Sequence, residues 1–213
     1  MAEPAPSAPK KGKLRENVEA ILIAIVLALF IRTFMVQAFK IPSGSMENTL
    51  LVGDHILVNK FIYGVKLPFV KKTIVPVREI RRDDIIVFEF PQNPRMDYIK
   101  RVIGLPGDVV EIRNKTVFVN SVKVENVHSV FKDTRIHPGL HQGVDPGRDN
   151  MAPQQVPAGK LFVMGDNRDF SYDSRFWGVV DQTAVKGKAF MVYWSWNSQT
   201  TGVRWNRLGH MLE

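Results

Sequence analysis

One long apolar segment near the N-terminus constrains this chain more than any other feature. Residues 20–31 are unbroken apolar, and apolar side chains continue, with polar interruptions, as far as Phe39. At ~1.5 Å per residue the unbroken part spans only ~18 Å, whereas the segment up to Phe39 is long enough for a hydrocarbon core of ~30 Å. We therefore expect one transmembrane helix over residues 17–39.

The charges around this segment predict its orientation. Residues 1–40 carry six lysines and arginines against three glutamates, and most of the positive charge precedes the apolar run. The positive-inside rule then places the N-terminus in the cytoplasm, with residues 1–16 as a disordered tail, and everything after Lys40 on the outer side. A cleaved secretory signal is the alternative, because residues 36–38 resemble a small-residue cleavage site.

Composition narrows the classes of function. The 213 residues include no cysteine, which excludes a disulfide scaffold, a Cys-based zinc site and a cysteine nucleophile. The net charge is +8, of which +5 falls beyond residue 40 without a nucleic-acid-binding signature, so we expect no nucleic-acid partner. His137 and His141 have a helical ligand spacing, but Pro138 and Gly139 break a helix there, so no metal or cofactor is expected.

The chain beyond the apolar segment is predicted to be mostly β. Short apolar or alternating runs are separated by Gly, Pro, Asn and Asp, which indicates a mostly antiparallel sandwich or open barrel. The expected strands are residues 55–63, 85–90, 98–103, 109–113, 116–119, 160–164 and 189–196. Between residues 123 and 158 the pattern lapses into a mixture of Pro, Gly, His and Asp, which predicts an inserted, loop-rich lobe.

Two serines just beyond the apolar segment are candidate nucleophiles. Ser43 and Ser45 flank Gly44, a pattern that an ordinary turn also contains. A serine hydroxyl needs a base, and none of the five histidines has a flanking pattern that recommends it, nor is there a G-x-S-x-G elbow. A spatial Ser-His-Asp triad stays open, and a lysine base is the alternative.

Lys100 and a polar cluster further along the chain are the other candidates. Strand alternation puts Lys100 on one face with Tyr98 and Val102, although a lysine on an exposed edge strand would look the same. Residues 165–178 are dense in charged, amide and hydroxyl groups, each of which needs a partner if it is near a core. A purely structural knot of ion pairs is the rival reading of that cluster.

Three motifs in order carry a family resemblance. Ser-Gly-Ser-Met, Tyr-Ile-Lys-Arg-Val-Ile-Gly-Leu-Pro-Gly-Asp, and Gly-Asp-Asn-Arg-Asp with a following Ser, Asp, Ser and Arg resemble the successive boxes of bacterial type I signal peptidase, the leader peptidase family. The resemblance implies a mostly β fold: an antiparallel catalytic core over residues 40–122 and 159–213, with a second lobe inserted at 123–158. A repressor-cleaving Ser-Lys peptidase, which shares this fold, and a non-catalytic membrane-anchored β-domain are the rivals.

The resemblance also implies a mechanism. Ser45 matches the nucleophile and Lys100 the general base, while the Ser43 hydroxyl joins the Ser45 backbone N–H in an oxyanion hole. An ordinary lysine, with a pKa of ~10.4, is neutral in only about one molecule in 2,500 at pH 7. We therefore expect Tyr98, Val102 and their apolar neighbours to desolvate Lys100 and lower its pKa.

Further residues take supporting roles by the same resemblance. Ser171 matches the serine that orients the lysine, and Asp173 and Arg175 match a supporting ion pair. Residues expected near the site are Met46, Tyr98 and Asp166, the last as a structural acid.

The resemblance implies partners and a location as well. The substrates are signal peptides of exported preproteins, with small residues before the cut, and the enzyme sits in the bacterial cytoplasmic membrane with its catalytic domain outside. The lipid bilayer and the export machinery are the other expected partners. Trp194 and Trp196 are read either as core residues or as residues that seat the domain in the membrane interface.

Overall fold

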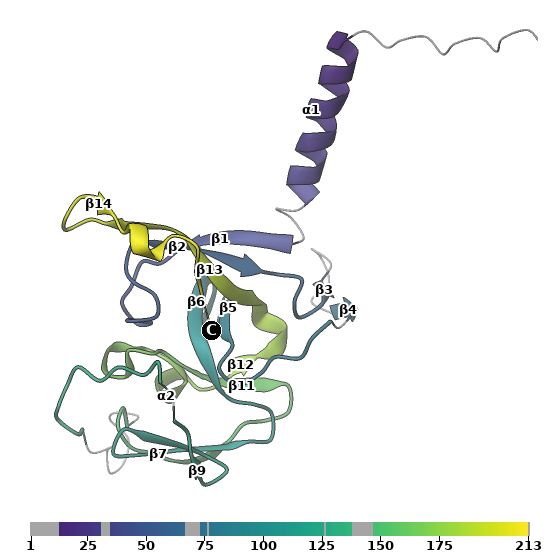
Figure 1. The fold of residues 1–213 in the computed structure, drawn as a ribbon. Coiled ribbons are helices and arrows are strands. Elements are labelled where there is room, and N and C mark those ends of the chain that lie inside the picture. Colours follow the sequence, from purple (N-terminus) through teal and green to yellow (C-terminus); the bar gives the residue numbers. More distant parts are fainter. Residues whose placement is uncertain are drawn as a thin grey trace, which may run out of the picture.

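The chain folds into an N-terminal helix and two larger β-sheets (Figure 1). The structure is a computed structural model, which describes residues 13–30, 35–66, 73–75, 77–125, 127–137 and 147–212. Within these residues, no helix combines the length and the apolar character that a membrane crossing requires. Most of the expected tail, residues 138–146 with His141, and residues 31–34 lie outside the described part.

Helix α1 (Lys13–Phe30) projects away from the sheets in Figure 1. It begins inside the segment expected to be disordered, because good helix formers start at Lys13 and Arg15 pairs with Glu19 one turn later at 3.0 Å. Its apolar side chains, such as Ile23, are exposed. The expected tail over residues 1–16 is therefore too long at its C-terminal end.

The expected transmembrane helix is wrong over its last residues. Val36–Lys40 forms strand β1, which pairs antiparallel with β2 (Asp54–Asn59) in the register Ala38 to Leu57. Gln37 and Phe39 are half-buried while Ala38 and Lys40 are exposed, which is the period-2 alternation of a strand with one covered face, and β2 pairs with the backbone along one edge of β1. Gln37, which we read as a polar interruption of a helix, therefore belongs to a strand.

The larger sheet carries the motifs. Its strand order is β1-β2-β13-β5-β6-β11-β12, with β14 and β15 both paired to β13. Besides β1 and β2, its strands are β5 (Ile85–Phe90), β6 (Asn93–Gly104), β11 (Lys160–Met164), β12 (Val180–Asp181), β13 (Val185–Asn197), β14 (Gly202–Val203) and β15 (His210–Met211). The named strands pair antiparallel, and the one parallel contact among the described residues is an isolated bridge between Val130 and Asn167, so the sheet is mostly antiparallel as predicted. The hairpin β3 (Val65–Lys66) and β4 (Thr73–Val75) stands apart.

The inserted lobe is larger than expected and contains its own sheet. This sheet has the order β10-β7-β8-β9 and consists of β7 (Val109–Arg113), β8 (Thr116–Val119), β9 (Val122–Lys123) and β10 (Met151–Gln155). The expected boundary at residue 123 left β7 and β8 in the catalytic core. It is wrong because both strands pair within the lobe, and strand periodicity says nothing about the choice of partner.

Apolar residues at the seam join the lobe to the catalytic core. Ile103 and Phe162 from the large sheet pack with Val110 and Val117 of the lobe and with Val156 after β10. The lobe and the core therefore share one buried cluster. Short helical segments complete the fold: α2 (Ser174–Trp177), η2 (Arg168–Phe170), η3 (Gln182–Ala184) and η4 (Trp205–Arg207).

Candidate active site

A buried lysine faces the serine of the first motif. Lys100 Nζ lies 2.8 Å from Ser45 Oγ and 3.0 Å from the carbonyl oxygen of Ile99. Lys100 is only 4% exposed, on a strand with neighbours on both sides, since β6 lies between β5 and β11. The alternative of a lysine on an exposed edge strand is therefore wrong.

Burial changes the acid–base behaviour of this lysine. Desolvation lowers the pKa of Lys100 to about 8, although the nearby carboxylates of Asp173 and Asp166 act in the opposite direction. Tyr98 contributes to the enclosure, because its ring centroid lies 5.5 Å from Lys100 Nζ. With a pKa of about 8, roughly one lysine in ten is neutral at pH 7.

The loop that carries Ser45 is fixed at its downstream end. Met46 is fully buried in the core cluster beside Leu50, and the N–H of Leu50 donates to the carbonyl of Met46 at 2.8 Å. Ser43 is exposed and Ser45 half-buried. The two serines thus stand at the surface while the residue after them anchors the loop in the core.

A buried ion pair links all three motifs. Arg101, the neighbour of Lys100, donates to both carboxylate oxygens of Asp166 at 2.9 and 2.8 Å, and both side chains are fully buried. Thr49 Oγ1 donates to the same carboxylate at 2.5 Å. Asp166 therefore ties the lysine strand and the serine loop to the third motif. Neither Arg101 nor Thr49 was expected as a site residue.

The expected ion pair of Asp173 and Arg175 forms close enough to Lys100 for both charges to act on it. Arg175 Nε is 2.8 Å from Asp173 Oδ1, and both side chains are almost wholly buried. Burial alone would raise the pKa of Asp173, but Arg175 and the N–H of Gly165 hold it below its usual range. Asp173 also accepts from the backbone N–H of Arg175 at the start of α2.

Ser171 and the Ser45 carbonyl both lie very close to the backbone of Gly165. A Cβ atom at Gly165 would come within 2.2 Å of Ser171 Oγ and 2.3 Å of the Ser45 carbonyl oxygen, so only glycine fits there. The buried Ser171 hydroxyl lies beside Asp173, and among the described residues it makes no hydrogen bond to Lys100. Its role in orienting the lysine stays a prediction.

Asn167, for which no role was expected, holds the serine loop by two hydrogen bonds. Its Nδ2 donates to the Gly44 carbonyl at 3.0 Å, and its backbone N–H donates to the Ser45 carbonyl at 3.2 Å. No spacing rule points to such a contact, because residues 44 and 167 meet only in the folded chain. The family motif around Asp166 was the one available signal.

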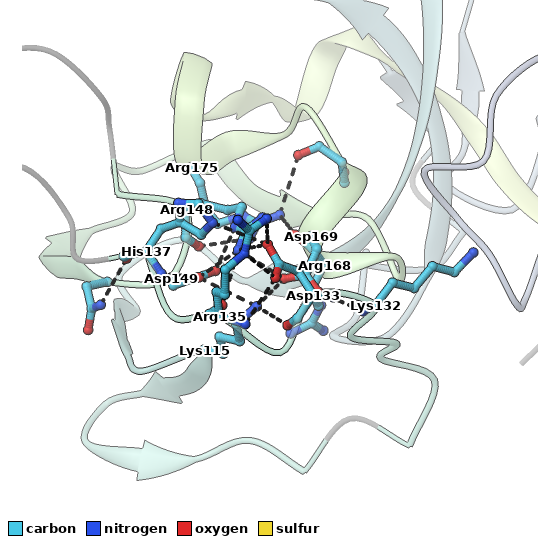
Figure 2. A network of polar contacts seen from close by, with 12 residues as sticks. Lys115, Lys132, Asp133, Arg135, His137, Arg148, Asp149, Arg168, Asp169 and Arg175 are labelled. Atoms are coloured by element: carbon cyan, nitrogen blue, oxygen red, sulfur yellow. Dashed lines mark hydrogen bonds and ion pairs between the residues drawn. The ribbon is translucent and has the colours of Figure 1, made fainter.

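A network of charges joins the lobe to the third motif (Figure 2). Asp169 of that motif accepts from Lys115 Nζ and from the backbone N–H groups of Lys132 and Asp133, the last two at 2.7 Å. Arg148 binds Asp133 at 3.2 Å in the same network. Part of the cluster at residues 165–178 is thus a structural knot of ion pairs, which was the rival reading of it.

One ion pair reaches from this network to the serine loop. Lys132 Nζ pairs with the carboxylate of Glu47, two residues after Ser45.

His137 is one of the two histidines that lie four residues apart in the sequence, and its ring contacts Asp133 at 3.2 Å. Within the described ranges, no group of three or more histidines, aspartates or glutamates is arranged to hold a metal ion.

Comparison with known proteins gives the family. The family model described as "Signal peptidase, peptidase S26" matches residues 14–194. Signal peptidase I of Pseudomonas fluorescens is 38% identical over an alignment that covers 88% of this chain and 75% of the relative. Signal peptidase I of Aquifex aeolicus is 35% identical, with 85% of each chain covered.

A solved structure matches as well. A signal peptidase I from Enterococcus faecalis has 33% sequence identity and a TM-score of 0.42, covering 52% of this chain and 97% of that one. By the family and sequence matches, the chain is a serine peptidase. It belongs to the signal peptidase family, peptidase S26, as the motifs indicated.

Proposed function

We propose that the chain is a membrane-anchored serine endopeptidase that removes signal peptides from exported preproteins. The observation that carries the proposal is the 2.8 Å contact between Ser45 Oγ and the buried amine of Lys100. A lysine serves as a general base when its amine is neutral near working pH and lies within hydrogen-bond reach of the nucleophile. Family membership and the name signal peptidase I, borne by its relatives, support signal peptides as the substrate.

The chemistry proceeds through an acyl-enzyme. Neutral Lys100 takes the proton of Ser45 Oγ as this oxygen bonds to the carbonyl carbon of the substrate. When the tetrahedral intermediate collapses, the C–N bond breaks and the leaving amine takes the proton from Lys100. Water then adds to the ester with Lys100 as its base, the bond to Ser45 breaks, and the serine regains its proton.

The developing oxyanion needs donors at the same place. The Ser45 backbone N–H and the hydroxyl of exposed Ser43 supply them in this proposal, since a serine hydroxyl rotates freely toward a nearby acceptor. Ser171 and the pair of Asp173 and Arg175 hold the amine in place from behind. Family membership supports these roles, and the charges of Asp173 and Arg175 act on Lys100.

Two features support the membrane location: helix α1 and two exposed tryptophans of the catalytic β-domain. The exposed apolar side chains of α1 need a nonpolar environment, and basic residues precede them. Trp194 and Trp196 on β13 are 37% and 41% exposed, which argues against the core reading and suits the membrane interface. The N-terminus is then cytoplasmic and the β-domain faces outward, where preproteins emerge from the export machinery.

Cleavage assays on variants of the full chain test this proposal. In detergent micelles, Ser45→Ala and Lys100→Ala should each lower the rate of preprotein cleavage by at least about 10³-fold, because the two residues act as a unit. Lys160→Ala is the matched control, since Lys160 makes only a surface ion pair with Asp181. Near-normal cleavage by either site variant would refute the proposed pair.

A further inference from the structure

One residue of the third motif fixes the peptide unit next to the nucleophile. The side-chain amide of Asn167 donates to the Gly44 carbonyl at 3.0 Å, while its backbone N–H donates to the Ser45 carbonyl at 3.2 Å. Asn167 is only 2% exposed. Two successive carbonyl groups of the serine loop are thus held from one side by a buried residue.

The Gly44 carbonyl belongs to the same peptide unit as the Ser45 N–H. That unit is planar, and in a trans peptide its C=O and N–H groups point in opposite directions. A donor that fixes the carbonyl on one side therefore fixes the direction of the N–H on the other. This N–H is the backbone donor that the proposed function assigns to the oxyanion.

We infer that Asn167 is a positioning residue of the oxyanion hole. Its amide holds the Gly44–Ser45 peptide so that the Ser45 N–H faces the charge that develops on the substrate carbonyl. The inference rests on the proposed function, because it presumes attack by Ser45. A donor fixed in advance stabilises the transition state without reorganising during the reaction, and a hydrogen bond onto the carbonyl also strengthens the N–H of the same unit.

The side-chain oxygen of Asn167, which has no partner among the described residues, supports this assignment. Asn167 Oδ1 is buried and has no hydrogen-bond partner among the described residues. The opposite orientation of the amide would set Oδ1 against the Gly44 oxygen, so the donor end is correctly placed. A buried, unpaired amide oxygen costs stability, so stability alone does not explain an asparagine here. The contact onto Gly44 is what the side chain provides.

Asn167→Ala tests the inference without introducing a charge near Lys100. The substitution keeps the backbone bond to Ser45 and removes only the bond to Gly44. Loss of a direct oxyanion donor typically costs about 10²- to 10³-fold in kcat, so loss of its support should cost about 10- to 100-fold. KM should change by less than about 3-fold, and the pH midpoint should stay at that of the wild type, because Lys100 is untouched.

A pair of inhibitors separates positioning from a general structural role. With a peptide aldehyde, Ser45 Oγ bonds to the aldehyde carbon, Lys100 takes the serine proton, and the carbonyl electrons move onto the aldehyde oxygen, which then occupies the oxyanion hole. The corresponding peptide alcohol makes no such bond. In Asn167→Ala the aldehyde should bind weaker by the same factor as kcat falls, while the affinity for the alcohol stays unchanged.

Matched variants make the result decisive. Asn150→Ala removes an amide that donates to the His137 carbonyl at 3.4 Å and accepts from the Asn114 N–H at 2.8 Å in the lobe, and it should keep full activity. Asn167→Ser replaces the alanine variant if that variant does not fold. An unchanged kcat, or equal weakening of both inhibitors, would overturn the role of Asn167 alone. Activity retained in Ser45→Ala would instead overturn the proposed function.

Discussion

Lys100→Met should abolish peptide cleavage and at the same time stabilise the protein. Methionine matches the length of the lysine stem but carries no amine, so we expect a loss of at least about 10³-fold in kcat/KM. The pKa of Lys100 falls from its ordinary 10.5 to about 8 by burial, a difference that corresponds to ~3 kcal/mol of unfavourable interaction for the charged form. We expect a gain of ~1–3 kcal/mol in the free energy of unfolding at pH 7, measured with urea.

The pH dependence of that gain follows from the sign of the shift. Because the pKa of Lys100 is lower in the folded chain, the unfolded chain binds more protons between about pH 8 and 10.5, and the wild type gains stability as pH rises through this window. The advantage of Lys100→Met should be largest below pH 8 and vanish above about pH 10.5.

Lys160→Met, on the surface, is the control and should change the free energy of unfolding by less than ~0.5 kcal/mol. A variant no more stable than wild type would contradict the burial cost.

Asp166→Asn should be among the most destabilising single substitutions in the chain. It leaves the fully buried guanidinium of Arg101 without its carboxylate, and the single amide oxygen replaces the two oxygens that now accept from Arg101 and Thr49. Breaking a buried pair by removing one partner costs ~3–5 kcal/mol, because the remaining charge stays in a nonpolar environment. Urea unfolding of the full chain in micelles measures the loss.

Asp181→Asn is the matched control for this substitution. Asp181 pairs with Lys160 at 2.7 Å, but the two side chains are 54% and 35% exposed, so solvent screens the pair. We expect a loss of less than ~1 kcal/mol for the control. If Asp166→Asn lost no more than Asp181→Asn, the buried pair would not be what holds the three motifs together.

Local pattern was enough to predict much of the sheet. The expected strands at residues 85–90, 109–113, 116–119 and 160–164 have the bounds of β5, β7, β8 and β11, because turn residues bound each run. Strand β6 starts five residues earlier than expected, since Asn93–Asp97 is a polar, exposed arm with no apolar alternation. Which strand pairs with which could not be predicted, because pairing depends on contacts between residues far apart in the sequence.

The candidate site was predictable only where a motif marked it. Ser45 and Lys100 were found as motif residues, and the structure brings them together over a sequence separation of 55. Strand alternation puts Arg101 on the face opposite Lys100, but nothing local shows that Arg101 is buried against Asp166. The contact of Asn167 with Gly44 joins residues 123 apart, and a side chain that binds a backbone carbonyl leaves no sequence pattern.

The pH dependence of kcat/KM tests the central claim most directly. If neutral Lys100 is the base, the rate of peptide cleavage by the full chain should rise about tenfold per pH unit below a midpoint at about pH 8 and level off above it. Lys100→Arg should be inactive throughout, since a guanidinium stays protonated. A flat profile between about pH 6 and pH 10, or an active arginine variant, would contradict the assignment of Lys100 as the base.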